Sequence, residues 1–143
     1  MSKEHGMRKD VVLALRGLGA VSVENGCGAG TPDINHTMGW IELKSLARVP
    51  PKGGPLRVPH FTPQQRAWLF KRDKMGGLAQ VLLKVGKHDW MLLSATTAFQ
   101  MLGRATYLEL LAAADWASSD GLDGPGLEGA IRRSWERLCS SKT

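Results

Sequence analysis

The chain has 143 residues, of which 43% are apolar, which is enough for one domain with a buried core. Its two cysteines are too few for a disulfide framework, and no paired Cys/His spacing indicates structural zinc. No apolar run is long enough to span a bilayer, and the charged first ten residues lack the apolar core of a secretion signal. We therefore expect a soluble, cytoplasmic protein with free thiols and no membrane partner.

The formal charge of +6 is unevenly distributed along the chain. Residues 1–90 carry 14 Lys and Arg against 7 Asp and Glu, whereas residues 91–143 carry 5 against 6. Such a basic excess in one part of a chain is typical of proteins that bind polyanions. Exposed Lys and Arg are also common on ordinary surfaces, but the clustering around an acidic motif, described below, favours nucleic acid as the partner.

The first predicted element is a helix over residues 3–17. Met7, Val11, Ala14 and Leu18 have the spacing of one helical face, and the glycines at 17 and 19 end the pattern. Glu4 lies three residues before Met7 and therefore on the inward side of this helix. Residues 20–24 then predict a short strand, and a glycine-rich segment follows it.

The segment GTPDINHTMGWIELK, residues 30–44, predicts a hairpin with strands at 32–35 and 40–44 and His36 in the turn between them. In this register Asp33 lies opposite Glu42, so the two carboxylates share one face of the hairpin. Lys44 points the same way as Glu42, because strand residues two apart share a face. Ile41 and Leu43 then face the core.

A long loop with four prolines is expected over residues 45–61. Thr62 is a predicted helix N-cap, Pro63 suits the first helical position, and Gln65 occupies the capping-box position. This helix should end at the glycine pair 76–77. Two further strands are predicted at 78–85 and 88–94, so the element order indicates an α/β fold around one mixed sheet.

The last fifty residues predict helices at 95–103, 105–117 and 126–138, with a linker at 118–126. Trp116 and Trp135 are interpreted as packing anchors of this region. We therefore divide the chain into a core, residues 1–95, and a C-terminal helical extension of the same domain, residues 96–143.

The paired carboxylates indicate a divalent metal. Two acids held together repel each other, and burial adds to the cost, unless a cation lies between them. Mg²⁺ prefers hard oxygen ligands and keeps several waters, so Asp33 and Glu42, with the Leu43 carbonyl as a third ligand, form a predicted site. Such a metal activates water for phosphodiester hydrolysis. Lys44 would position that water or stabilise the developing negative charge, although an isolated ExK tripeptide is common and by itself indicates only an ion pair.

These motifs in this order, GTPD, WIELK, a basic loop and FTPQQRAWL, resemble the PD-(D/E)XK nuclease superfamily. The similarity spans roughly residues 4–94 and is strongest to phage-type VRR-NUC and Holliday-junction-resolvase-like members. It implies a restriction-endonuclease-like αβββαβ core, Mg²⁺ or Mn²⁺ as cofactor, and DNA cleavage. It also implies that Asp33 and Glu42 are metal ligands and that Lys44 is the catalytic lysine.

The resemblance implies two more site residues, each with an alternative. An acid on the first helix would be Glu4, with Glu24 as the competing candidate. A glutamine on the helix after the ExK strand would be Gln65, which is equally explained by helix capping, and Gln64 is the neighbouring alternative.

The residues and the resemblance together predict a DNA endonuclease that selects branched DNA. The resemblance to phage proteins further implies a role in phage or prophage recombination, replication or packaging in the host cytoplasm. Cutting a four-way junction symmetrically requires a homodimer. A general flap, nick or duplex nuclease and an inactive DNA-binding protein with the same fold are the alternatives. Phosphate contacts are expected from five basic residues, which are Arg48, Lys52, Arg57, Arg66 and Lys71.

Overall fold

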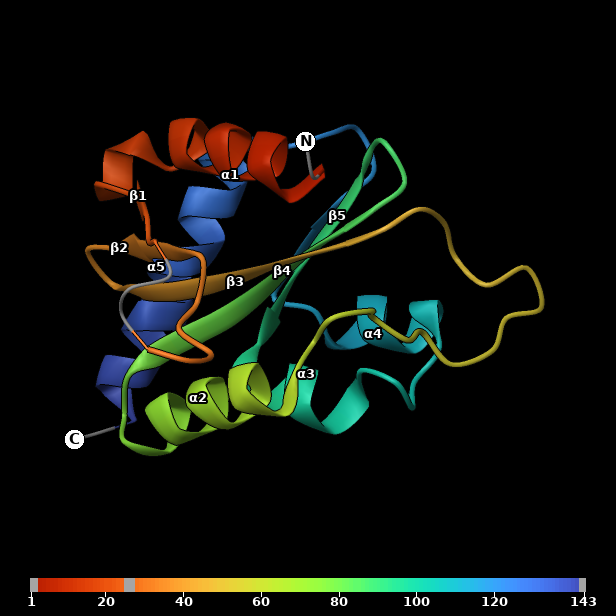
Figure 1. The fold of residues 1–143 in the computed structure, drawn as a ribbon. Helices are drawn as coiled ribbons and strands as arrows, with labels where there is room; N and C mark the ends of the chain where they lie inside the picture. Colours follow the sequence, from red (N-terminus) through yellow and green to blue (C-terminus); the bar gives the residue numbers. More distant parts are fainter. Residues whose placement is uncertain (1–2, 25–27, 142–143) are drawn as a thin grey trace.

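The fold is that of a computed structural model, in which residues 3–24 and 28–141 are described, residues 3–5 by their backbone alone. Strands and helices are interspersed along the chain (Figure 1). Their order is α1 (Lys3–Ala14), a 3₁₀ turn (Arg16–Leu18), β1 (Val21–Ser22), β2 (Ile34–His36), β3 (Gly39–Leu46), α2 (Pro63–Lys74), β4 (Leu78–Val85), β5 (Asp89–Ser94), α3 (Ala95–Met101), α4 (Tyr107–Ala113), β6 (Trp116–Ser118) and α5 (Gly124–Ser140).

The strands form one six-stranded sheet in the order β1-β2-β3-β4-β5-β6. Among the strands of the described residues, only the central β3–β4 pair is parallel, and α2 connects these two strands. The other neighbours are antiparallel. The element order from α1 to β4 is therefore the αβββαβ core that the resemblance implied, and the sheet is mixed, as predicted.

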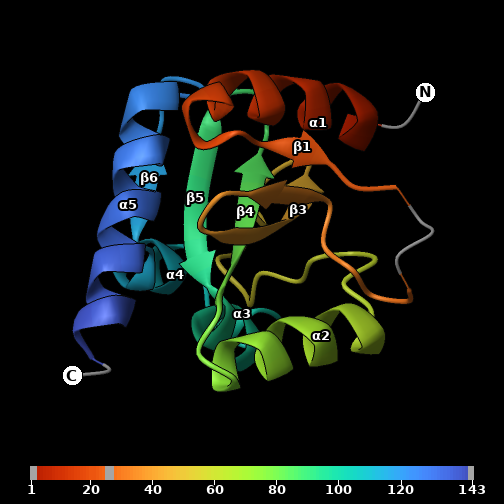
Figure 2. The same cartoon turned by 90° about the vertical axis from the view of Figure 1, so that its left-hand side faces the viewer.

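Helices cover both faces of this sheet and form two cores (Figure 2). On one face α1 and α5 pack against the sheet through residues such as Val11 and Ile131. On the other face α2, α3 and α4 pack against it, together with the loop after β3. The middle of β3 is buried on both faces, since helices cover each of them. Its odd-numbered residues face the α1 side and its even-numbered residues face the α2 side.

The predicted helix α2 is confirmed in detail. Thr62 accepts a hydrogen bond from the Gln65 N–H, and the Gln65 side chain accepts one from the Thr62 N–H, which is a complete capping box. Helix α1 ends three residues earlier than predicted, and the 3₁₀ turn follows it. The loop after β3, residues 47–62, projects beyond the end of the strand (Figure 1). It is fixed at Leu56, which exchanges two backbone hydrogen bonds with the α3–α4 connection.

The helical interpretation of residues 105–117 was wrong at its C-terminal end. Helix α4 stops at Ala113, Ala114 is extended, and residues 116–118 form strand β6. The open edge of β5 explains this, because β6 pairs with it and the Asp115 N–H donates to the Leu92 carbonyl. The C-terminal extension therefore adds one strand, β6, to the sheet. Trp116 and Trp135 are half-buried against the α1-side core, as expected of packing anchors.

His36 also differs from its prediction, since it ends strand β2 and is buried rather than lying in an open turn. Its Nδ1 accepts the Met38 N–H at 3.2 Å, while its Nε2 has no hydrogen-bond partner within the described residues. Burial lowers the pKa of His36 from 6.5 to about 4. The imidazole is therefore neutral in the folded protein at neutral pH.

This lowered pKa predicts a pH-dependent stability. The unfolded chain binds a proton at His36 below pH 6.5 and the folded chain does not, so the contribution of His36 to stability is full above pH 6.5 and is lost as the pH drops towards 4. The loss is on the order of 3 kcal/mol, at 1.36 kcal/mol per pKa unit. We expect urea unfolding between pH 4.5 and 7.5 to show that the free energy of unfolding changes with pH differently in the two proteins. His36→Met should lose less of it towards acid pH than wild type does. The exposed His88→Met variant is the control, and equal slopes in all three proteins would contradict the assignment.

Candidate active site

The β2–β3 hairpin brings the predicted acidic residues together. The structure pairs Asn35 with Trp40 and Ile34 with Ile41, which is the predicted register. Asp33, just before β2, lies close enough to Glu42 for a side-chain hydrogen bond and for charge repulsion. Ile41 and Leu43 are fully buried in the α1-side core, so the partition of apolar and charged side chains is as predicted.

Glu42 and Lys44 form a buried ion pair on the α2 side of β3. The Lys44 Nζ lies 3.1 Å from Glu42 Oε2, and the two side chains are 3% and 2% exposed, respectively. Burial, followed by the repulsion from Asp33, raises the pKa of Glu42 from 4.5 to about 8, although Lys44 acts in the opposite direction. Lys44 thus offsets only part of the effect of burial and of the repulsion from Asp33 on Glu42.

Lys44 is held by three acceptors. Besides Glu42, its Nζ donates to the His60 carbonyl and to Gln65 Oε1, each at 2.9 Å. An ammonium group has three N–H donors, so all three are used. His60 adopts a left-handed conformation with φ of 63°, which is unusual for a non-glycine residue, and its carbonyl points at Lys44.

Gln65 combines the two roles that the sequence left as alternatives. Its Oε1 accepts both the Thr62 N–H, as a capping-box residue, and the Lys44 ammonium, as a site residue. An amide oxygen has two lone pairs, so the two roles are compatible. The neighbouring Gln64 is exposed.

Asp33 has two partners that sequence reasoning did not provide. Its Oδ2 accepts the Leu43 N–H at 2.8 Å, and its Oδ1 forms an ion pair with Arg8. Arg8, on α1, also donates to the Ser22 side chain and to the Val23 carbonyl. The signal for Arg8 was present, because it lies four residues after Glu4 and hence on the same edge of α1. It fixes the first helix against the acidic site.

The remaining predicted acids are less informative. Glu4 belongs to α1, but its side chain lies outside the described residues, so its role stays a prediction. Glu24 is exposed and lines a cavity of about 480 Å³ together with Asp33, Arg8 and Gln65. Asp33 and Gln65 therefore border a cavity whose lining includes exposed residues such as Glu24.

Gly28 and Gly30, before the hairpin, line this cavity, and Gly30 lies against the start of α2. Gly28 and Gly30 have positive φ values of 107° and 82°, a conformation that L side chains rarely adopt. A Cβ at Gly30 would lie 2.6 Å from the backbone carbon of Gln64, at the start of α2. The segment therefore needs glycine for approach to the helix backbone.

A Gly30→Ala variant should therefore be strongly destabilised. Both the positive φ and the overlap with a backbone that cannot rotate away oppose the substitution, and each such strain costs about 1–3 kcal/mol. We expect a melting temperature lower by 10 °C or more, given about 4 °C per kcal/mol for a domain of this size. Gly53→Ala is the control, since its φ is also positive but nothing lies near its Cβ. Equal melting of the two variants would contradict the steric account.

The oxygen donors of this site fit a divalent cation. Asp33 and Glu42 offer carboxylates on one face, and the raised pKa of Glu42 indicates a buried acid in need of positive charge. Mg²⁺ is commonly held by one or two carboxylates together with waters and substrate phosphates. Within the part of the chain with described side chains, no group of three or more His, Cys, Asp and Glu residues gathers. The Leu43 carbonyl as a third ligand stays a prediction.

The predicted phosphate-binding residues lie on the loop after β3 and on α2. Four of the five are exposed, namely Arg48, Lys52, Arg57 and Lys71. Arg66 is half-buried, donates to the Phe61 carbonyl and stacks on the Phe61 ring at 4.7 Å. Arg66 is thus partly engaged in fixing the start of α2, and its DNA contact stays a prediction like those of the others.

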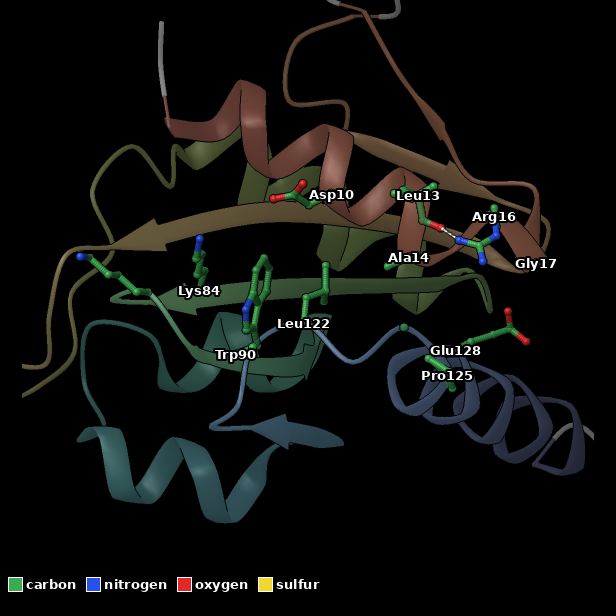
Figure 3. A pocket seen from close by; sticks show the side chains of 13 residues that line it. Asp10, Leu13, Ala14, Arg16, Gly17, Lys84, Trp90, Leu122, Pro125 and Glu128 are labelled. Atoms are coloured by element: carbon green, nitrogen blue, oxygen red, sulfur yellow. Dashed lines mark hydrogen bonds between the residues drawn. The ribbon is translucent and has the colours of Figure 1, made fainter.

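A larger cavity, of about 700 Å³, lies between α1, β5 and the start of α5 (Figure 3). Its walls mix acids such as Asp10 and Glu128 with bases such as Lys84, and buried Trp90 forms part of them. Trp90 belongs to the α1-side core, so this cavity is separated by the sheet from the Glu42–Lys44 pair. Its mixed charges do not favour a metal or a polyanion.

No protein-family model and no curated protein matches this chain. Among solved structures, it is similar to the Holliday junction resolvase Hjc of Archaeoglobus fulgidus, an archaeal hyperthermophile, with 22% identity and a TM-score of 0.44. The alignment covers 67% of this chain and 75% of that chain. In the described part of the molecule, no helix has the length and apolar character needed to cross a bilayer. At this level of similarity the activity must be inferred from the chain's own residues.

Proposed function

We propose that the protein is a metal-dependent DNA endonuclease that hydrolyses phosphodiester bonds and prefers branched DNA. The observation that carries this proposal is the convergence of Asp33, Glu42 and Lys44 on one side of the β2–β3 hairpin, beside an open cavity. A purely structural role is a poor explanation for two acids on one buried face, because their repulsion and desolvation oppose folding.

Each residue has a distinct role in this proposal. Asp33 and Glu42 would hold Mg²⁺ or Mn²⁺, which when bound supplies an activated water and neutralises charge on the phosphate. Lys44 keeps two of its donors on His60 and Gln65, neither of which is a proposed metal ligand. The third, given to Glu42 here, is the donor that a water or a phosphate oxygen can receive. Arg8 orients Asp33 from α1.

Branched DNA is proposed because the exposed Lys and Arg side chains of the loop can contact phosphates, which carry no sequence information. Arg48, Lys52 and Arg57 are exposed and belong to the loop 47–62, which extends beyond the end of β3 (Figure 1). Phosphate contacts provide affinity without sequence preference, so shape selects the substrate. A four-way junction has two-fold symmetry, and symmetric cutting would require a homodimer. The resemblance to phage-type nucleases extends the proposal to phage or prophage DNA recombination, replication or packaging.

The test is cleavage of labelled four-way junction, flapped duplex and linear duplex in parallel, in Mg²⁺, Mn²⁺ or EDTA. Paired, symmetric nicks on the junction, together with a dimer by light scattering, are the expected result. Equal cutting of all three DNAs by a monomer would overturn the junction preference and leave a general nuclease. Binding of all three without cutting in either metal would overturn the enzymatic proposal.

A further inference from the structure

A second cluster of side chains lies on the same side of β3 as the Glu42–Lys44 pair. Trp40 precedes Glu42 by two residues, so both point to the α2 side of the strand. Its ring meets that of Trp68, on α2, edge to face at 5.2 Å. The guanidinium of Arg72 lies over both rings, 4.5 Å from Trp68 and 5.8 Å from Trp40. The fold thus brings two aromatic rings and an arginine plane together between β3 and α2.

This cluster borders a cavity of about 620 Å³ at the C-terminal end of α2. Its lining consists of Trp68, Lys71, Arg72, Met75, Gly76 and Gly77. Met75 is 76% exposed, and Lys71 and Arg72 are also exposed, so the cavity opens to solvent with an apolar and a basic wall.

The glycine pair shapes this cavity. Gly76 has a φ of 88°, which turns the chain at the end of α2. A Cβ at Gly77 would lie 2.8 Å from the Arg72 Cδ. The absence of a side chain at Gly77 therefore lets the Arg72 stem lie against the backbone while its planar end stacks on Trp68.

The cavity lies at a defined distance from the candidate active site. Gln65, which contacts Lys44, and Arg72 are seven residues apart on α2, which corresponds to about 10 Å along the helix. This equals the rise of about three nucleotides of a DNA strand. A strand with a phosphate beside Lys44 can thus place a nearby base at the cavity.

We propose that this cavity binds an unpaired nucleobase of the DNA substrate, two or three nucleotides from the scissile phosphate. Aromatic rings and arginine planes bind bases by stacking, and stacking tolerates any base identity. A phosphate is bound by positive charge and does not require an aromatic ring, so the rings indicate a base as the ligand. Lys71 supplies that charge at the rim for the adjoining backbone. A fully paired duplex cannot fill the cavity, so the site would favour DNA with unpaired nucleotides at a branch point. This inference rests on the proposed function, since it assumes a DNA substrate.

Binding in EDTA tests this inference without any cutting. Two flapped duplexes with a five-nucleotide single-stranded tail are compared by fluorescence anisotropy, one with thymines in the tail and one with abasic residues. Their phosphates are the same, so the difference in affinity reports the base alone. Wild type should bind the thymine tail about tenfold more tightly. Equal affinities would overturn the inference.

Variants then assign the effect to this cavity. Trp68→Leu removes the ring, and Arg72→Lys keeps the charge but removes the stacking plane. Both should reduce the preference for the thymine tail to about twofold or less, whereas Trp68→Phe should retain most of it. Arg132→Lys, an exposed arginine on α5, is the matched control and should behave as wild type. Because Arg72 is exposed, its variant remains informative even if Trp68→Leu folds poorly, and an unchanged preference in Arg72→Lys would overturn the assignment.

The same proteins in Mg²⁺ separate this inference from the proposed function. A tenfold preference for thymine tails in EDTA, lost in Arg72→Lys, supports the base site even if no DNA is cut. Cutting by wild type with no preference between the tails would overturn the base site and leave the nuclease proposal standing.

Discussion

A Glu42→Gln variant is expected to lose cleavage and, at the same time, to unfold at a higher temperature than wild type. Gln has the shape of the protonated acid, so it removes a buried charge that is repelled by Asp33. A residue selected for stability would behave in the opposite way. Gain of stability with loss of activity is the signature of a functional site that is strained in the absence of its ligand.

The size of this gain depends on pH in a defined direction. The folded pKa of Glu42, about 8, lies above the ordinary value of 4.5, so the contribution of Glu42 to wild-type stability is most favourable below pH 4.5 and is lost as the pH rises towards 8. At pH 7 the cost is on the order of 3 kcal/mol. Thermal melts in EDTA at pH 5 and pH 8 should show a larger advantage for Glu42→Gln at pH 8.

The exposed Glu136→Gln substitution is the matched control for this experiment, and it should show no such change with pH. A Glu42→Gln protein that is less stable than wild type at pH 8 would contradict the description of Glu42 as a strained acid. In that case the ion pair with Lys44 would outweigh burial and the repulsion from Asp33.

A Lys44→Met variant is expected to lose at least a hundredfold in cleavage rate while still binding Mn²⁺. Removing one donor that stabilises charge in a transition state typically costs about 10² to 10³ in rate. Lys44 is not a proposed metal ligand, so calorimetric titration with Mn²⁺ should give an affinity within a few-fold of wild type. Glu42→Gln, in contrast, should lose both cleavage and metal binding.

The control for Lys44→Met is Lys84→Met, another strand lysine, which is half-buried and lies over Trp90 at 5.3 Å. It should cleave as wild type does. Full cleavage by Lys44→Met would contradict any role of Lys44 in the reaction. Loss of Mn²⁺ binding together with cleavage would instead assign Lys44 to holding the two acids in place.

The predictable parts of the fold were those specified by local sequence. The capping box of α2, the hairpin register and the burial of Ile41 and Leu43 follow from residue types a few positions apart, and the structure confirms all three. The placement of Glu42 and Lys44 on the face opposite Leu43 follows from the alternation of strand side chains.

The unpredicted parts depend on contacts between distant segments. Strand β6 forms because β5 has an open edge, which no local pattern in residues 105–117 reveals. Arg8 reaches Asp33 across 25 positions of sequence, and Arg72 stacks on Trp40 across 32. Such pairs become visible only when the helices are placed on the sheet. The two roles of Gln65 required the same step, because the sequence showed capping but not the distance to Lys44.

The most direct test of the central claim is cleavage of a labelled four-way junction by wild type and by Asp33→Asn, each in Mg²⁺ and in EDTA. Asn keeps an oxygen for the Leu43 N–H but removes the charge that a cation needs. We expect product only from wild type with Mg²⁺. Product from wild type in EDTA, or from Asp33→Asn at the wild-type rate, would contradict a metal-dependent nuclease built on Asp33, Glu42 and Lys44.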